Sequence, residues 1–204
     1  HLSLRRQRQM CIRDSSWAVP QGALISWALM MEGGVQINAL GQRFHDETQG
    51  YSEAAVHVLA QPGGVAWNVF DGALLQFAQD FPDFVAAQSA GAVQQADDVG
   101  ALAKLIGCPT DSLQKTIDAI VAGTDPTTHR HFKRPLQAPF YAIKVTGALF
   151  HTQGGLDIDA GARVLREDGQ PLPNLLAAGG AARGVSGQEV WGYLSGNGLL
   201  SAIA

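Results

Sequence analysis

Strand-like segments lie on both sides of a helical stretch, and this order is the strongest constraint on the fold. Residues 35–38 and 64–71 are apolar runs typical of strands, and residues 140–151 and 155–173 predict further strands and a hairpin. Between them, residues 97–106 and 111–122 carry apolar side chains at the spacing of amphipathic helices. A helical insert between two strand-rich parts fits either an α/β or an α+β fold.

Several local features sharpen this order. Residues 42–47 predict a second short strand, and residues 51–60 predict a helix that Ser52 would cap. Residues 125–139 are rich in Pro, Thr and His and predict a polar loop. Residues 174–184 predict a buried strand that ends in glycines.

The composition excludes several classes of function. Glycine supplies 24 of 204 residues, against a usual share of about 7%, which favours tight turns and close backbone approach to a ligand. A net charge of −4 offers no basic surface, so we expect no nucleic-acid partner. The apolar run at residues 23–31 has about half the length of a membrane span. Cys11 and Cys108 form neither a disulfide framework nor a metal spacing, so we expect a reducing, cytoplasmic location.

Both ends of the chain are unusual. The opening HLSLRRQRQMCIRDS is basic and lacks the apolar core of a signal peptide. It resembles translated adaptor sequence, so we expect residues 1–15 to be a non-native segment, with a natural basic arm as the alternative. The ending YLSGNGLLSAIA leads from glycines into a helix that has barely begun. We expect that helix to continue in the complete protein.

Three stretches, taken in order, point to a family. They are GGVQINALGQRFHDE (33–47), FHTQGGLDID (150–159), and PLPNLLAAGGAARGVSG followed by GYLSGNGLL (171–200). In this order and spacing the chain, over residues 20–204, resembles the C-terminal half of fumarate reductase/succinate dehydrogenase-type flavoproteins. Their 3-ketosteroid dehydrogenase and tricarballylate dehydrogenase-like branch is the most similar. The resemblance implies FAD as the cofactor.

The resemblance also implies a division of the chain. Such proteins have a Rossmann-type FAD domain with a mobile capping domain inserted into it, and they hold the substrate between flavin and cap. By this likeness residues 16–35 and 146–204 would be parts of the FAD-binding domain. Residues 36–145 would form the capping, substrate-binding domain. The implied fold is therefore α/β with an α+β insert.

Tyr51 is the candidate proton carrier. The resemblance places it where fumarate reductases carry a proton-donating arginine and 3-ketosteroid dehydrogenases carry a tyrosine base. Tyrosine has a reference pKa of about 10, so a base of this kind needs a lowered pKa near neutral pH. The alternative is an aromatic side chain that packs at the start of a cap helix.

Two further residues are candidates for holding the substrate. His151 matches a family histidine that hydrogen-bonds substrate beside the flavin, and a neutral imidazole can donate one bond and accept another. The alternative is a structural histidine at a strand end. Tyr193 stands where fumarate reductases place the arginine that clamps a carboxylate. A tyrosine cannot form that bidentate fork, so it favours a carbonyl oxygen that gains negative charge.

The glycine-rich segments are the candidate flavin contacts. Gly179-Gly180 replace the family's Gly-Glu pair, so the usual acidic contact to the FAD ribityl or ribose is absent. Arg183 is a spare cation for which solvent or structural roles are favoured over substrate binding. The start of the last helix would present backbone N–H groups to the flavin and favour its reduced, anionic form. The implied cofactor-binding residues are Gly154, Gly155, Gly179, Gly180, Ser195, Gly196, Asn197, Gly198 and Leu199.

Together these features predict part of an FAD-dependent dehydrogenase or reductase. Its small-molecule substrate would have a C–C bond next to a carbonyl, as in ketosteroids and enones, and its electron donor or acceptor is not indicated. One alternative is a fumarate reductase or tricarballylate-type dehydrogenase with a carboxylate substrate. Another is a truncated, non-catalytic binding fragment, because no G-x-G-x-x-G fingerprint follows a strand. GVSGQ lacks the context of a serine hydrolase elbow, and His129 and His131 form a weak metal signal, so we expect no metal.

Overall fold

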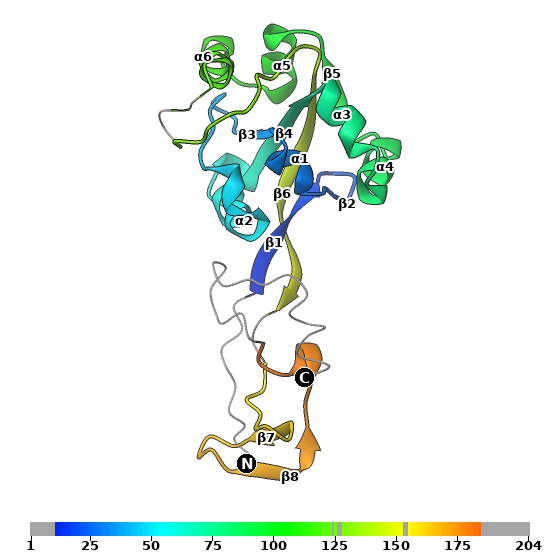
Figure 1. Ribbon diagram of the computed structural model, residues 1–204, viewed down its shortest axis with the longest axis vertical. Coiled ribbons are helices and arrows are strands. Elements are labelled where there is room, and N and C mark those ends of the chain that lie inside the picture. Colours follow the sequence, from blue (N-terminus) through cyan, green and yellow to red (C-terminus); the bar gives the residue numbers. More distant parts are fainter. Residues whose placement is uncertain (1–10, 124, 126–127, 153–154, 185–204) are drawn as a thin grey trace. The chain divides into compact units, whose positions relative to one another are not determined.

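The computed structural model describes residues 11–123, 125, 128–152 and 155–184 (Figure 1). The chain divides into two compact units. One spans Ser15–Ala148, and the other combines His1–Asp14 with Leu149–Ala204. The unit boundaries cut two strands, β1 (Cys11–Ala18) and β6 (Phe140–Thr152). Sheets and helices together give a mixed α/β class.

A sheet of strands of unequal length organises the Ser15–Ala148 unit. Its strand order is β2-β1-β6-β4-β3, and β5 also pairs with β6. The remaining bounds are β2 Ala23–Leu24, β3 Val35–Ile37, β4 Val65–Asp71 and β5 Gln94–Ala96. The long β4–β6 ladder runs from Val65 opposite Thr146 to Asp71 opposite Phe140. β4 and β6 are the central strands, which explains their apolar sequences.

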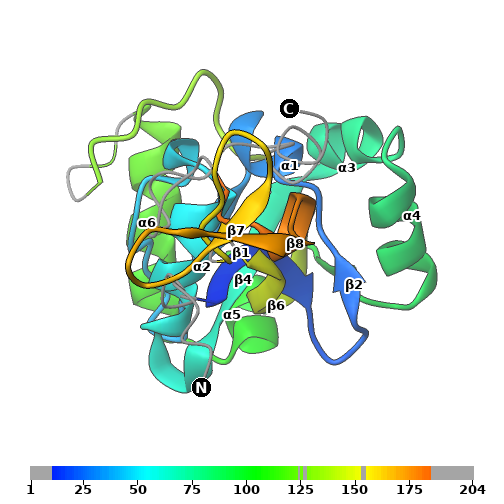
Figure 2. The same cartoon turned by 90° about the horizontal axis from the view of Figure 1, so that it is seen from below.

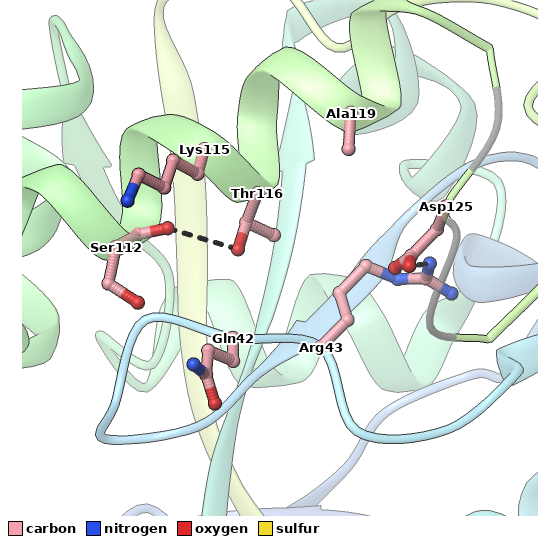
Figure 3. Close-up of a pocket in the computed structure, with 7 residues that line it drawn as sticks. All are labelled: Gln42, Arg43, Ser112, Lys115, Thr116, Ala119 and Asp125. Carbon is pink, nitrogen blue, oxygen red and sulfur yellow. Dashed lines mark hydrogen bonds and ion pairs between the residues drawn. The ribbon is translucent and has the colours of Figure 1, made fainter.

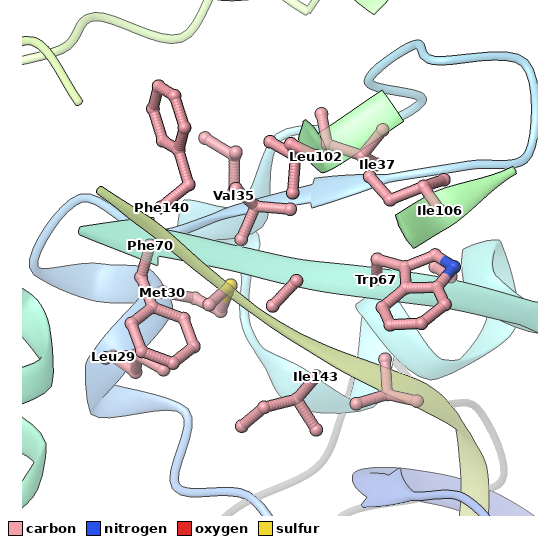
Figure 4. Close-up of a cluster of buried hydrophobic side chains, with 14 of the residues drawn as sticks. Leu29, Met30, Val35, Ile37, Trp67, Phe70, Leu102, Ile106, Phe140 and Ile143 are labelled. Atoms are coloured by element: carbon pink, nitrogen blue, oxygen red, sulfur yellow. The ribbon is translucent and has the colours of Figure 1, made fainter. Parts of the chain in front are cut away.

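Side chains from both faces of this sheet are buried. The cross-strand pairs Val35–Val69 and Ile37–Trp67 share one face of β3 and β4. Phe70 and Ile143 belong to the other face, since successive side chains of a strand alternate. Figure 4 shows the two sets separated by the strands, and they belong to one apolar cluster.

Helices cover the sheet, and two of them, α3 and α5, begin at a side-chain cap. Asp71 accepts a hydrogen bond from the Leu74 amide, and Asp98 accepts one from the Ala101 amide, so each carboxylate satisfies a free helix N–H. In the view from below, α3 and α4 lie on the side of the sheet away from α6, and α4 contacts β2 (Figure 2). The bounds are α1 Ala28–Met31, α2 Tyr51–Leu59, α3 Gly72–Ala78, α4 Pro82–Ser89, α5 Val99–Ile106 and α6 Thr110–Val121, with 3₁₀ turns η1 Glu47–Gln49 and η2 Pro62–Gly64.

A small hairpin forms the described part of the second unit. Strands β7 (Arg163–Leu165) and β8 (Pro171–Leu176) pair antiparallel, and the turn between them is closed by hydrogen bonds between Arg166 and Gln170. The 3₁₀ turn η3 (Gly179–Ala181) follows. A minor apolar cluster holds this part together, formed by Val164, Leu172, Ala177 and Ala182.

The structure corrects four expectations. Residues 42–47 are not a strand, because the carbonyls of His45 and Glu47 accept bonds from side chains of Arg43 and Trp27. Ser52 does not cap α2: Gly50 holds the N-cap position without a side-chain bond. Residues 174–176 are exposed rather than buried. Helix α4 was not predicted, and residues 155–159 form isolated bridges instead of a full strand.

The proposed division into flavin and substrate parts stays a prediction. Residues 16–35 contribute the end of β1 and all of β2 and α1 to the Ser15–Ala148 unit. β1 begins at Cys11, within the segment predicted to be non-native. Across the described residues, no helix has both the length and the apolar character that a membrane crossing requires.

Candidate functional site

Tyr51 opens helix α2, and a glycine sets its position. Gly50 precedes it with a φ of 124°, a backbone conformation that side-chain-bearing residues rarely adopt. Tyr51 is half-buried. It lines a narrow void beneath α2 together with the polar side chains of Ser16, Gln36 and Thr146. The candidate proton carrier therefore lies beside polar groups of the sheet.

A chain of hydrogen bonds crosses the sheet beside this void. The Gln36 amide nitrogen donates to Asn68 Oδ1 at 2.8 Å, and the Asn68 amide donates to Ser16 Oγ at 3.2 Å. Gln36 Oε1 must therefore accept, so His45 Nε2, 2.8 Å away, carries a proton. The network thus assigns His45 the neutral Nε2–H tautomer and leaves a lone pair on Nδ1.

Glu47 is the centre of a buried ion cluster just before α2. Its carboxylate accepts from Arg43 Nε at 3.1 Å and Arg43 Nη2, from Arg130 Nη1 at 2.8 Å, and from the Gln36 backbone amide at 2.8 Å. The second guanidinium also donates to the carbonyls of Gly34 and Met30, both at 2.8 Å. Glu47 is fully buried, so these bonds replace its lost hydration.

The second acid and an aromatic ring complete the cluster. Asp125 accepts from Arg43 Nη1 at 2.5 Å, which brings the formal charge of two arginines and two acids to zero. Phe132 lies with its ring centroid 4.8 Å from the guanidinium carbon of Arg43 and 4.9 Å from that of Arg130. Both cations therefore also contact an aromatic ring.

The cluster sets the ionisation of its members. Burial alone would raise the pKa of Glu47, but the hydrogen bond and charge of Arg43, with the charge of Arg130, hold it below its usual value. Burial would lower the pKa of Arg43, yet Glu47 and Asp125 raise it. Glu47 and Arg43 are therefore both charged at neutral pH.

His45 behaves differently because burial dominates. Burial lowers the pKa of His45 to about 4, although the nearby Glu47 charge acts in the opposite direction. Its ring stacks on that of His57 with centroids 5.1 Å apart, and His57 and Arg43 disfavour the charged form further. Among the described residues, His45 Nδ1 has no hydrogen-bond partner. The imidazole is therefore neutral near pH 7.

We expect the His45 environment to make stability fall in acid. In the unfolded chain the histidine has a pKa of about 6.5, so between pH 6.5 and 4 the unfolded state binds more protons than the folded state. The stability associated with neutral His45 is complete above pH 6.5 and is lost as pH falls through 4, by about 3 kcal/mol in total. Urea unfolding of the chain and of His45→Gln between pH 4 and 7 measures this difference.

The control for this prediction is His131→Gln, since His131 is exposed. The His45→Gln variant should show a flatter pH dependence than the parent chain, whereas the control should follow the parent. Burial would raise the pKa of Asp46, but its hydrogen bonds to Thr48 lower it. Asp46 is present in the parent and in both variants, so its contribution to the pH dependence of stability is the same in all three. Parallel curves for the His45 variant and the parent would contradict the buried-histidine argument.

Three of the predicted glycines lie in the described part of the second unit. A Cβ on Gly155 would lie 2.4 Å from the carbonyl carbon of Ala182, so this glycine is required by the backbone bridge between Leu156 and Ala182. A Cβ on Gly180 would meet no atom of the described residues within 4 Å. The backbone N–H groups of Gly179 and Gly180 donate to no described acceptor. These two donors, with the open space at Gly180, fit an acceptor-rich ligand such as a flavin cofactor.

The structure describes only some of the remaining candidate residues. His151 belongs to β6, but its side chain lies outside the described part. Arg183, considered as a spare cation, forms an ion pair with Asp157 at 2.9 Å and is therefore engaged. Outside the described residues lie Gly154, Tyr193, Ser195, Gly196, Asn197, Gly198 and Leu199.

The cluster around Glu47 was not predicted from the sequence. Arg43 and Glu47 are four residues apart, a spacing that places side chains together in a turn, but the segment was interpreted as a strand. Arg130 lay in a loop described only as polar. The detectable signal was the spacing of Arg43 and Glu47, an opposite-charge pair four residues apart.

Comparisons with known proteins agree with the resemblance. A family model described as "FAD binding domain" matches residues 10–199. The probable fumarate reductase Ifc3 of Shewanella frigidimarina is 32% identical over 88% of this chain. The 3-oxosteroid 1-dehydrogenase of Mycobacterium tuberculosis strain H37Rv is 28% identical over 86% of it. The chain spans 31% and 39% of these two proteins, about one third of each.

A solved structure has the same fold. The open conformation of a flavocytochrome c3 fumarate reductase superposes with a TM-score of 0.71 at 28% sequence identity. The match covers 97% of this chain and 36% of that chain. The fold described above is therefore one that occurs within a larger flavoprotein.

Proposed function

Because the chain belongs to the FAD binding domain family, we propose that it is part of a flavin-dependent oxidoreductase that introduces or removes a C–C double bond next to a carbonyl. The chain covers about one third of its curated relatives, so the activity proposed is that of the complete protein. FAD is the cofactor that the family membership indicates. A partial Rossmann-type FAD domain with a capping domain is the architecture that goes with this proposal.

The chain supplies residues for the proton and for the substrate oxygen. When bound, the flavin supplies hydride transfer at its N5 position. Tyr51 Oη carries the proton to or from the neighbouring carbon. His151 and Tyr193 hold and polarise the substrate oxygen. The N–H groups of Gly179 and Gly180 contact the cofactor, as do Gly154, Gly155 and residues 195–199.

The observation that supports the substrate preference is a tyrosine at both positions, 51 and 193, where fumarate reductases carry arginines. The buried arginines nearby do not compensate, because Arg43 and Arg130 are held by Glu47 and backbone carbonyls. Arg183 is held by Asp157. A bidentate clamp on a carboxylate requires a free guanidinium fork, and the forks of Arg43 and Arg130 are occupied. A carbonyl substrate needs only a hydrogen-bond donor, which supports ketosteroid-like and enone substrates.

A carboxylate substrate is the second candidate. It is favoured by the 32% identity to a probable fumarate reductase, which exceeds the 28% identity to the 3-oxosteroid 1-dehydrogenase. In that case the substrate class would be fumarate-like or tricarballylate-like. The carboxylate clamp would then have to come from residues other than Arg43, Arg130 and Arg183.

Anaerobic flavin spectroscopy of the complete protein separates the two candidates. The oxidised protein is mixed with a saturated ketosteroid or cyclic ketone, and bleaching of the flavin absorption near 450 nm is followed. The reduced protein is mixed in turn with an enone and with fumarate. We expect turnover with the ketone or enone and none with fumarate. Turnover with fumarate alone would overturn the carbonyl preference.

A further inference from the structure

A polar pocket of about 410 Å³ opens between α6 and the turn that precedes Arg43. Its size lies within the range of small-molecule sites. Figure 3 shows Ser112, Lys115 and Thr116 along α6, opposite Gln42, while Arg43 reaches Asp125 at the other end. All of these residues belong to the Ser15–Ala148 unit, and none of them is a residue assigned above to the flavin chemistry.

At the Arg43–Asp125 end of the pocket, every N–H group of Arg43 already donates to an acceptor within the protein. Arg43 has five N–H groups, and each has an acceptor. Nε and one Nη2 hydrogen donate to the Glu47 carboxylate, and the other Nη2 hydrogen donates to the His45 carbonyl. The two Nη1 hydrogens donate to Asp125 and to Thr128 Oγ1. Asp125 neutralises this cation and also accepts from the Thr128 amide at 3.3 Å. The ion pair at this end therefore has no net charge, and Arg43 has no N–H group left for a ligand.

At the α6 end of the pocket, three polar side chains are available to a ligand. The Lys115 ammonium, the Ser112 hydroxyl and the Gln42 side-chain amide make no hydrogen bond or ion pair with the described residues. Thr116 Oγ1 is the exception, because it donates to the Gly41 carbonyl at 2.7 Å and offers a ligand only its lone pairs. The open end thus combines one full positive charge with two neutral donors.

We propose that this pocket binds a small carboxylate. The anion is placed at the Lys115 ammonium and accepts from Ser112 Oγ and the Gln42 amide, while the Arg43–Asp125 pair forms the far wall. One cation and two neutral donors match the single charge and four lone pairs of a carboxylate. A phosphate dianion would require a second uncommitted cation, and Arg43 does not supply one.

The arrangement also sets the strength of binding. Lys115 is exposed, so its attraction is screened by water and salt. We expect a dissociation constant on the order of millimolar that rises as NaCl is added. A hydroxyl on the carboxylate would gain an acceptor in Thr116 Oγ1.

NMR titration of the ¹⁵N-labelled 204-residue chain with sodium lactate tests the proposal. Lactamide, which has the same shape without the charge, serves as the neutral control, and inorganic phosphate serves as the competing anion. We expect saturable shifts of amides in residues 41–43 and 112–116 with lactate, and none with lactamide. Saturable shifts with phosphate but not with lactate would overturn the choice of carboxylate.

A matched pair of variants separates the pocket from general charge effects. Lys115→Gln should weaken lactate binding at least tenfold, whereas Lys104→Gln, on the exposed surface of α5, should leave it unchanged. Both positions are exposed, so the parent spectrum should persist in each variant. Equal lactate affinity in the parent and Lys115→Gln would overturn the proposal, as would an equal loss in both variants.

Discussion

Replacing Glu47 with glutamine is expected to lower the free energy of unfolding by about 3–5 kcal/mol. Glutamine has nearly the same size, so the change removes a charge without opening a cavity. Arg130 then has no carboxylate, and Arg43 keeps only Asp125, although both guanidiniums stay almost entirely buried. A buried charge that loses its partner keeps the full cost of desolvation. Urea unfolding of the chain at pH 7 measures the loss.

Glu32→Gln is the matched control, since Glu32 lies exposed at the end of α1. Surface substitutions of this kind usually change stability by less than about 0.5 kcal/mol. A double variant that adds Arg130→Met should cost less than the sum of the two single changes, because both remove the same interaction. A loss below about 1 kcal/mol for Glu47→Gln would show that the cluster contributes little to stability.

Tyr51→Phe in the complete protein is expected to reduce kcat by about 10²- to 10⁴-fold, the usual contribution of a positioned acid or base. The change removes one oxygen atom and leaves the ring at the start of α2 in place. If Tyr51 carries the proton, KM for the ketone or enone should change little, because the loss occurs in the chemical step. Steady-state kinetics with a measured flavin content for each preparation gives both constants.

Tyr141→Phe provides the control for this experiment. Tyr141 is also half-buried, and its ring stacks on Phe70 with centroids 5.9 Å apart, away from the proposed chemistry. It should retain parent turnover and flavin content. Normal turnover in Tyr51→Phe would assign Tyr51 to packing and leave the family membership unaffected. Loss of flavin in that variant would also count against a purely chemical role.

The elements predicted best were those whose pattern depends on nearby residues. β4 and α6 follow directly from an apolar run and from 3.6-residue spacing, and their bounds agree closely with expectation. Helix α4 was missed because its hydrophobic residues form no clear stripe, and only Phe84 and Ala87 are buried. Its start is set by Pro82 in the first turn, a weak signal without its surroundings.

The candidate site was predictable only in part, for a physical reason. Tyr51 was predicted from the family resemblance, and the structure puts it at a helix start, while its role stays a prediction. His45 and Arg130 were not found, because their roles come from partners that are distant in sequence. Arg130 meets Glu47 across 83 residues, and local periodicity contains no information on such a contact. Composition likewise cannot show that Arg43 is saturated.

The same long-range ion pairs bear on the order in which the Ser15–Ala148 unit forms. Glu47 needs Arg130, and the central strand β4 needs β6, which begins at Phe140. A nascent chain that has emerged only to about residue 120 therefore exposes one edge of β4 and lacks half of the cations that Glu47 requires. Contacts that join distant segments slow folding, since the intervening loop must close first. This unit therefore cannot be completed before β6 has emerged. A chaperone that shields β4 until then would act at the step where the unit is most open to wrong strand pairing.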